Sequence, residues 1–188
     1  MMKKMSGVMA ALFLSAFCII MGQPAPVTAN SGAAELATMI AEAAPLFVQR
    51  EFKAGDKILR YNLFVPKEAA GKDKLPLLLF LADAAPVGKD LASPLTPGNG
   101  GLIWATAKAQ GKTPCYVVAP QFAQAPVSES YAAGPEAGLV VPMLRELCKS
   151  ENIDPKRIYV TGQARGGMLA MYLNIAYPQE FAASLFVD

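Results

Sequence analysis

The chain has 188 residues, of which 53% are hydrophobic and 17% are charged, which suits one folded domain and excludes a disordered chain. Its 17 basic residues barely exceed its 15 acidic ones, so nothing supplies the basic stripe that nucleic-acid binding needs. The sequence contains no histidine. A Ser-His-Asp triad, a histidine-paired cysteine and a histidine metal site are therefore excluded within this chain, and we expect neither a metal nor a cofactor.

Residues 1–29 have the pattern of a secretory signal peptide. Two lysines near the start precede an apolar segment, Val8–Met21, which is short for a membrane-spanning helix. Small residues up to Ala29 indicate a cleavage site, so the mature chain is expected to begin near Asn30 and to be secreted or periplasmic. An uncleaved anchor and a lipoprotein attached through Cys18 are the weaker alternatives. Removal of this peptide leaves equal numbers of basic and acidic residues.

A lead-in over 30–45 precedes a domain that we predict over 46–188. Within the lead-in, Ser31–Ala44 is alanine-rich, with apolar residues spaced as on a helix, and forms either a short packing helix or a loose segment. Phe47–Phe52 and Ile58–Val65 are predicted strands, and the Gly-Asp pair between them suits a tight turn. The pattern therefore indicates an antiparallel hairpin at a sheet edge.

Continuous apolar segments follow, as in strands that are covered on both faces: Leu75–Ala82, Cys115–Ala119, Ile158–Thr161 and Ala183–Val187. Helical patterns separate them, over Leu102–Gln110, from Pro135 to Ser150, and from the turn after Thr161 toward Pro178. Pro120 is expected to end the second of these strands, and the run Asn152–Pro155 to break the chain before the third. The alternation predicts an α/β fold, a mostly parallel sheet of about six strands with helices on both faces.

The stretch Arg157–Tyr177 joins a strand to a helix through a glycine-rich turn. Gly162 and Gly166 stand where the G-x-S-x-G elbow of serine nucleophiles has its outer glycines. Such a turn needs glycine because it is strained and because the strand and helix backbones approach closely. Its middle position is Ala164 here instead of serine. The sequence thus predicts the scaffold for a nucleophile without the nucleophile.

Further segments carry a family resemblance in their order and spacing: RYNLFVP (Arg60–Pro66), LPLLLFLAD (Leu75–Asp83), GGLIWA (Gly100–Ala105), PCYVVAPQF (Pro114–Phe122), NIDPKRIYVTG (Asn152–Gly162) and YPQEFAASLF (Tyr177–Phe186). With them, the chain resembles the N-terminal two-thirds of secreted α/β-hydrolases of the carboxylesterase, polyhydroxybutyrate-depolymerase-like and prolyl-oligopeptidase-like kind. The resemblance implies the first six strands of that fold. It also implies hydrolysis of carboxylic esters or peptides by a serine, with an ester, peptide or carboxylate as ligand and without a cofactor.

The resemblance also implies site positions. The nucleophile position falls on Ala164, whose methyl group cannot attack a carbonyl. The backbone amide of Arg165 would be one oxyanion-hole donor, with Gln163 beside it and the second donor in the loop at Ala82 and Asp83. An aspartate there is unfavourable beside a developing oxyanion unless its side chain points away. The triad acid and histidine of the family would follow strands that this sequence does not include.

Three hypotheses follow. The chain is a hydrolase-fold protein without activity, a binding protein whose elbow pocket holds an anion or acyl group at Arg165, or one part of a split hydrolase. Arg165 either binds a substrate carboxylate or is an exposed turn residue that packs its stem on a neighbour. Asp83 either faces a ligand or caps nearby loop amides. Ser128, Ser130 and Ser184 lie near plausible site elements, but each lacks a base partner.

Two further expectations concern the end of the sheet and the cysteines. Without the family's C-terminal helices, Leu185, Phe186 and Val187 would form an exposed apolar edge, so we expect a homo-oligomer or a partner chain to cover it. Cys115 and Cys148 either form a disulfide, as exported proteins allow, or remain separate buried thiols.

Overall fold

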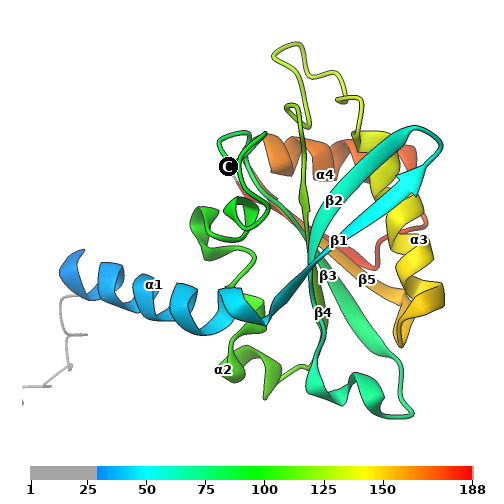
Figure 1. Cartoon of the computed structure of the whole chain (residues 1–188). Helices are drawn as coiled ribbons and strands as arrows, with labels where there is room; N and C mark the ends of the chain where they lie inside the picture. Colours follow the sequence, from blue (N-terminus) through cyan, green and yellow to red (C-terminus); the bar gives the residue numbers. More distant parts are fainter. Residues whose placement is uncertain (1–28, 188) are drawn as a thin grey trace, which may run out of the picture.

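The computed structural model describes residues 29–187, and the predicted signal peptide lies outside this range except for its last residue. A six-stranded sheet forms the centre, with helices on both faces (Figure 1). The strands are β1 (Phe47–Ala54), β2 (Lys57–Phe64), β3 (Leu75–Leu81), β4 (Tyr116–Gln121), β5 (Ile153–Gln163) and β6 (Ala183–Val187). The α-helices are α1 (Ala29–Ala43), α2 (Ala107–Gln110), α3 (Val140–Ser150) and α4 (Arg165–Ala176), and short 3-10 helices include η4 (Pro97–Asn99), η5 (Ile103–Ala105) and η6 (Ala137–Leu139).

The strand order is β1-β2-β4-β3-β5-β6. β1 and β2 form the predicted antiparallel hairpin, turning at Gly55, whose φ is 60°, and β2 also pairs antiparallel with β4. The remaining neighbours are parallel. The predicted α/β class is confirmed: the sheet is mostly parallel, the hairpin lies at one end, and β6 forms the opposite edge. The lead-in forms a helix rather than a loose segment.

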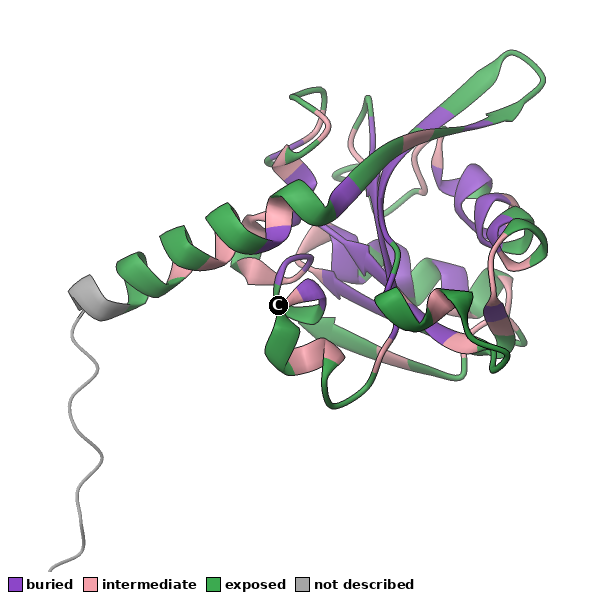
Figure 2. Cartoon of the chain, turned by 60° about the horizontal axis from the view of Figure 1, so that its bottom comes forward, coloured by how far each residue is buried: buried purple, intermediate pink, exposed green. Residues whose placement is uncertain are grey.

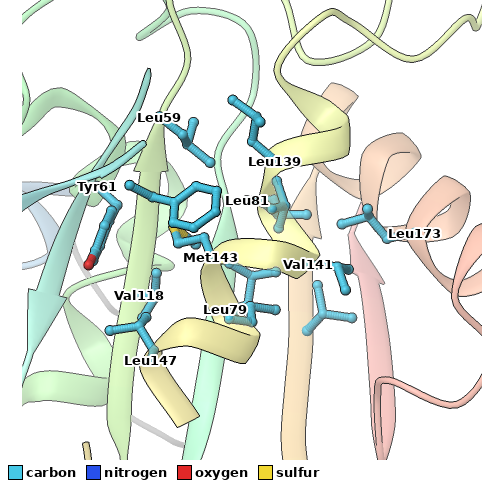
Figure 3. Close-up of a cluster of buried hydrophobic side chains, with 14 of the residues drawn as sticks. Leu59, Tyr61, Leu79, Leu81, Val118, Leu139, Val141, Met143, Leu147 and Leu173 are labelled. Atoms are coloured by element: carbon cyan, nitrogen blue, oxygen red, sulfur yellow. The ribbon is translucent and has the colours of Figure 1, made fainter. Parts of the chain in front are cut away.

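Side chains alternate between two apolar layers. One layer packs strand residues such as Leu79, Leu81 and Val118 against Met143 of α3 and Leu173 of α4 (Figure 3). The other packs a different set, including Phe80 and Val117, against Leu102 and the C-terminal half of α1. Figure 2 shows the buried sheet between these layers, while much of α1 is exposed.

The connections explain which helix covers which face. The crossovers through α3 and α4 both run toward the β6 edge and place their helices on one face. The β3-to-β4 connection, which contains η5 and α2, runs the opposite way and lies on the other face. A right-handed crossover produces this pattern, because reversing the direction along the sheet reverses the face.

The helix predicted over Leu102–Gln110 is wrong as one element. Thr106 is extended, with φ of −65° and ψ of 149°, and separates η5 from α2. Its hydroxyl accepts a hydrogen bond from the backbone N–H of Ala109 at 3.3 Å, so it caps a new helix. The helix predicted from Pro135 also begins later, as η6 followed by α3.

Two predicted strand boundaries are also wrong. β4 continues through Pro120, which pairs with Tyr61 of β2. Its pairing with β3 ends at Val118, so Pro120 has a neighbour on one side only and its missing N–H is tolerated there. β5 begins at Ile153 rather than Ile158. The expected break is an irregularity in the pairing with β3, where the register shifts between Leu75 and Leu77, and the strand continues through it.

Candidate functional site

The centre of the candidate site is the turn between β5 and α4. Ala164 lies between these elements with φ of 48° and ψ of −116°, a conformation that is costly for a residue with a side chain. Its N–H donates to the Val187 carbonyl of β6 at 2.8 Å, and its carbonyl accepts from Met168 N–H at 3.0 Å. The neighbouring strand and helix therefore hold the strained residue from both sides.

The two outer glycines are required by close backbone contacts. A Cβ atom on Gly162 would lie 2.3 Å from the Gly166 carbonyl oxygen, and one on Gly166 would lie 2.0 Å from the Leu81 carbonyl oxygen. Neither distance is compatible with a side chain. The local sequence thus folds as a strained elbow for the reason that its glycine pattern indicates.

The backbone amide of Arg165, the candidate oxyanion donor, already has an acceptor within the chain. Asp83 follows β3, and its Oδ1 accepts a hydrogen bond from Arg165 N–H at 3.4 Å. The Asp83 side chain therefore points toward the candidate oxyanion position and not away from it. This geometry agrees with the interpretation of Asp83 as a cap for a nearby amide.

The Arg165 side chain is also paired. Its guanidinium forms an ion pair with Glu129, which lies in the loop between β4 and η6. The Glu129 side chain is 86% exposed, whereas that of Arg165 is 29% exposed. The Arg165 side chain is thus partly exposed, and its charge is paired with a loop that is distant in sequence.

The remaining predicted residues adjoin the same turn. Gln163 contacts η4, since a Cβ on Gly98 would lie 2.6 Å from Gln163 Oε1. Ala82 is buried and lines a cavity of about 10 Å³ together with Asp83 and Gln121. That space is close to the minimum for one water molecule. The structure thus brings the predicted residues together around the turn, and the cavity beside Ala82 and Asp83 has room for about one water molecule.

Sequence reasoning missed two residues of the site. Glu129 lies in an irregular loop, where no periodic pattern indicates which side chain faces the elbow. Gln121 is buried at the end of β4, where its Nε2 donates to the Pro86 carbonyl at 2.7 Å, while its Oε1 has no hydrogen-bond partner in the described part of the chain. The sequence offered no signal for Gln121, because Pro120 was expected to end the strand and Gln121 was placed in the loop that follows.

The side chains at this site offer little reactive chemistry. Ser128 and Ser130 hydrogen-bond to each other at 2.9 Å, and Ser184 donates to Asn174 Oδ1 at 2.9 Å. Cys115 and Cys148 are free thiols, so the disulfide alternative is wrong and the separate thiols are found. Burial raises the pKa of both thiols and disfavours their thiolates. Residues 29–187 contain no group of three or more potential metal-ligating His, Cys, Asp or Glu side chains.

Within the same residues, no helix has both the length and the hydropathy needed to cross a membrane.

Comparison with known proteins supports the fold assignment. No family model and no curated protein matches the chain. Among solved structures, a thermostable esterase is similar over 76% of this chain and 40% of its own, at 29% identity and a TM-score of 0.70. An arylesterase is similar over 84% of this chain and 50% of its own, at 15% identity and a TM-score of 0.52. An acetyl xylan esterase from Aspergillus awamori is similar over 73% of this chain and 50% of its own length, at 18% identity and a TM-score of 0.54.

The chain therefore spans about half or less of the length of these solved esterases. The strand order, the strained elbow and these similarities agree with one another. The chain is related to the α/β-hydrolase superfamily and comprises part of that fold.

Proposed function

We propose that this chain is an exported α/β-hydrolase-fold protein that does not hydrolyse esters or peptides by itself. One observation carries the proposal: Ala164 has the strained backbone of a nucleophile elbow, and its side chain is a methyl group. The absence of histidine from the sequence supports it, since an introduced hydroxyl would still lack the base that activates it.

The contact at Arg165 N–H is a second obstacle to hydrolysis. An oxyanion hole works by directing preorganised donors at the charge that develops in the transition state. Here the Asp83 carboxylate accepts the hydrogen bond of Arg165 N–H at 3.4 Å, where an oxyanion would have to bind. A developing oxyanion would meet a like charge there, and at short range that repulsion is unfavourable. The missing nucleophile and the occupied donor are independent obstacles.

The test is an assay of p-nitrophenyl acetate and a peptide p-nitroanilide with the full chain, beside the variants Ala164→Gly and Ala164→Ser. We expect no turnover above buffer for all three proteins, because none of them contains a base for the nucleophile. An activity that stays proportional to the chain through successive columns, and that changes with substitutions at residue 164, would contradict the proposal.

A second candidate function is the binding of a carboxylate at the elbow without cleavage. It is favoured because both donors of Arg165, its backbone amide and its guanidinium, already bind carboxylates within the chain. Glu129 lies on an exposed loop, so a ligand carboxylate could replace it at low cost, since exposed ion pairs contribute little.

Acetate and succinate titrations followed by NMR test this binding. We expect a saturable shift that Glu129→Gln strengthens, because the internal competitor is gone, and that Arg165→Ala abolishes. Lys149→Ala, an exposed cation on α3, serves as the control for loss of charge. No shift in either wild type or Glu129→Gln would rule out this candidate. The split-hydrolase hypothesis stays a prediction as well, and a partner would have to supply the nucleophile.

A further inference from the structure

A small cavity lies at the point where β3 and β4 end. Its volume is about 10 Å³, and Asp83, Val87 and Gln121 are among the residues that line it. We call this feature the Gln121 cavity. A space of that volume is close to the minimum that holds one water molecule. Size therefore restricts its occupant to a single small molecule or ion.

The Gln121 side chain is held at one end of its amide and unpaired at the other. It is 6% exposed, and its Nε2 donates to the carbonyls of Pro86 at 2.7 Å and Lys89 at 3.3 Å. These two bonds establish which amide atom is the oxygen, because a carbonyl accepts a hydrogen bond and cannot donate one. The Oε1 atom is buried and has no hydrogen-bond partner among residues 29–187. A buried acceptor without a donor is unfavourable, so this oxygen requires one.

The lining of the Gln121 cavity explains why the chain does not supply that donor. Three lining residues have no backbone N–H, since they are prolines: Pro86, Pro94 and Pro120. The N–H of Val87 already donates to the Ala84 carbonyl at 3.1 Å. The donor that Gln121 Oε1 requires therefore has to come from the occupant.

Asp83 brings a second acceptor to the same cavity. Its Oδ1 accepts from Arg165 N–H at 3.4 Å, and a carboxylate has lone pairs for further hydrogen bonds. An occupant between this carboxylate and the Gln121 amide oxygen has to donate in two directions. A water molecule does so with its two O–H groups, and it has the right size.

We propose that the Gln121 cavity binds one structural water, which donates one hydrogen bond to Gln121 Oε1 and the other to the Asp83 carboxylate. The water joins the end of β4 to the loop after β3 and, through Asp83, to Arg165 N–H at the start of α4. Gln121 is then a positioning residue, because through the water it holds the carboxylate beside the elbow amide. The proposal concerns only these groups and does not rest on the lack of hydrolysis.

A cation fits the Gln121 cavity less well than water. A calcium ion takes six to eight oxygen ligands, and residues 29–187 contain no group of three or more potential His, Cys, Asp or Glu ligands. Ammonium matches water in size, but burying an ion costs much more than burying a neutral molecule. The test below distinguishes ammonium from water.

Nuclear Overhauser spectroscopy between solvent water and the isotopically labelled full chain tests the proposal. A water on Gln121 Oε1 lies close to the side-chain N–H groups of the same residue. We therefore expect a cross-peak between water and these protons, with the sign of a bound molecule. Gln49 on β1 is exposed and serves as the internal control, because its hydration water exchanges too quickly to give such a cross-peak.

Variants locate the water. Val87→Ile adds a methyl group to the lining, so the cross-peak should be lost and the Arg165 N–H resonance should shift. Val127→Ile is the matched control, since Val127 is a buried valine of the same apolar layer that does not line the cavity, and it should keep the cross-peak. Circular dichroism confirms that each variant is folded before it is compared.

A second control removes a hydroxyl that could imitate the signal. The Ser93 hydroxyl donates to the Pro86 carbonyl at 3.2 Å, close to Gln121 Nε2, and its proton exchanges with solvent. Ser93→Ala should therefore keep the cross-peak if a water produces it. This comparison with wild type decides the proposal even where Val87→Ile does not fold.

Four results would overturn the proposal. They are no cross-peak in wild type, loss of the cross-peak in Ser93→Ala, a cross-peak that persists in folded Val87→Ile, and a cross-peak that fades as ammonium chloride is added. The last result would identify ammonium as the occupant. An Arg165 N–H resonance that stays unchanged when Val87→Ile expels the water would contradict the positioning role of Gln121.

Discussion

The helices α3 and α4 lie on the same face of the sheet, yet they differ in how completely they are packed. α3 has one apolar face, which is buried through residues such as Val141, Leu144 and Leu147, and its other face carries charges. α4 is apolar around most of its circumference, and residues on its outer face are exposed: Met168, Met171, Tyr172 and Ile175. A helix that is apolar on all sides is typically a buried helix. α4 therefore has the sequence of a covered element and the surroundings of an uncovered one.

The same difference separates the two ends of the sheet. On the side formed by β1, β2, β4 and α3, the apolar face of α3 is buried and its outer face carries charges, although Val48 of β1 and Ile58 of β2 are 48% and 43% exposed. At the β6 side, the exposed α4 face meets the β6 edge and an apolar groove of about 710 Å³ that Leu78, Tyr159 and Leu185 line. Leu185, Phe186 and Val187 are 60%, 45% and 45% exposed. We call these two regions the closed side and the open side. That other polypeptide covers the exposed edge stays a prediction.

The largest expected effect compares one apolar truncation on each helix. Leu144 of α3 is 0% exposed and Ile175 of α4 is 80% exposed. Leu144→Ala should lower the free energy of unfolding by about 2–5 kcal/mol, because it leaves a cavity in the core. Ile175→Ala should change it by less than about 0.5 kcal/mol. Urea unfolding of both variants measures the difference, and similar losses would contradict the division into two sides.

The next prediction sharpens the comparison, because the start of α4 is tightly seated although its outer face is open. Gly166→Ala places a Cβ about 2.0 Å from the Leu81 carbonyl oxygen and should cost roughly 1–3 kcal/mol or more. Gly138→Ala in η6 is the control, since nothing lies within 4 Å of its Cβ position. Thermal unfolding compares the two, and a neutral Gly166→Ala would mean that the elbow is looser than described.

The strain at Ala164 predicts a smaller effect of opposite sign. Ala164→Gly should raise the free energy of unfolding by about 1 kcal/mol, because glycine tolerates φ of 48° while its greater flexibility in the unfolded chain offsets part of the gain. Ala164→Val should lower it. Chemical denaturation measures both, and a less stable glycine variant would show that the elbow backbone is not strained.

The smallest effect concerns pH and the buried thiol just before β4. Burial raises the pKa of the Cys115 thiol, so the native state favours the protonated form. This contribution to stability is present below the ordinary thiol pKa and is lost as the pH rises through the higher native value. Wild type should therefore lose more stability than Cys115→Ala between neutral and alkaline pH. Equal losses in the two proteins would contradict the raised pKa.

The sequence predicted features that depend on local patterns. The apolar strands, the hairpin and the elbow follow from periodicity and from Gly162 and Gly166, whose backbone contacts leave no alternative residue. The break at Thr106 and the passage of β4 through Pro120 did not follow, because each depends on which neighbour the segment meets. The Arg165–Glu129 ion pair was also missed, since it joins an elbow to an irregular loop that is distant in sequence.

The apolar groove over β3, β5 and β6 is the clearest feature that only the structure reveals. From the sequence, Leu78 and Tyr159 are ordinary residues of predicted buried strands, and Lys108 is an ordinary surface residue. Which part of a sheet face stays uncovered depends on strand order and on the direction of the crossovers. That information emerges when β3, β5 and β6 are placed side by side.

Hydrogen exchange across the two sides tests the central claim most directly. Local opening is easier where few buried contacts hold an element. The account predicts that β6 and the C-terminal half of α4 exchange well before α3 and β4 in the full chain. Equal protection of α3 and α4 in the isolated chain would contradict the account, because it would mean that the open side is packed as tightly as the closed side.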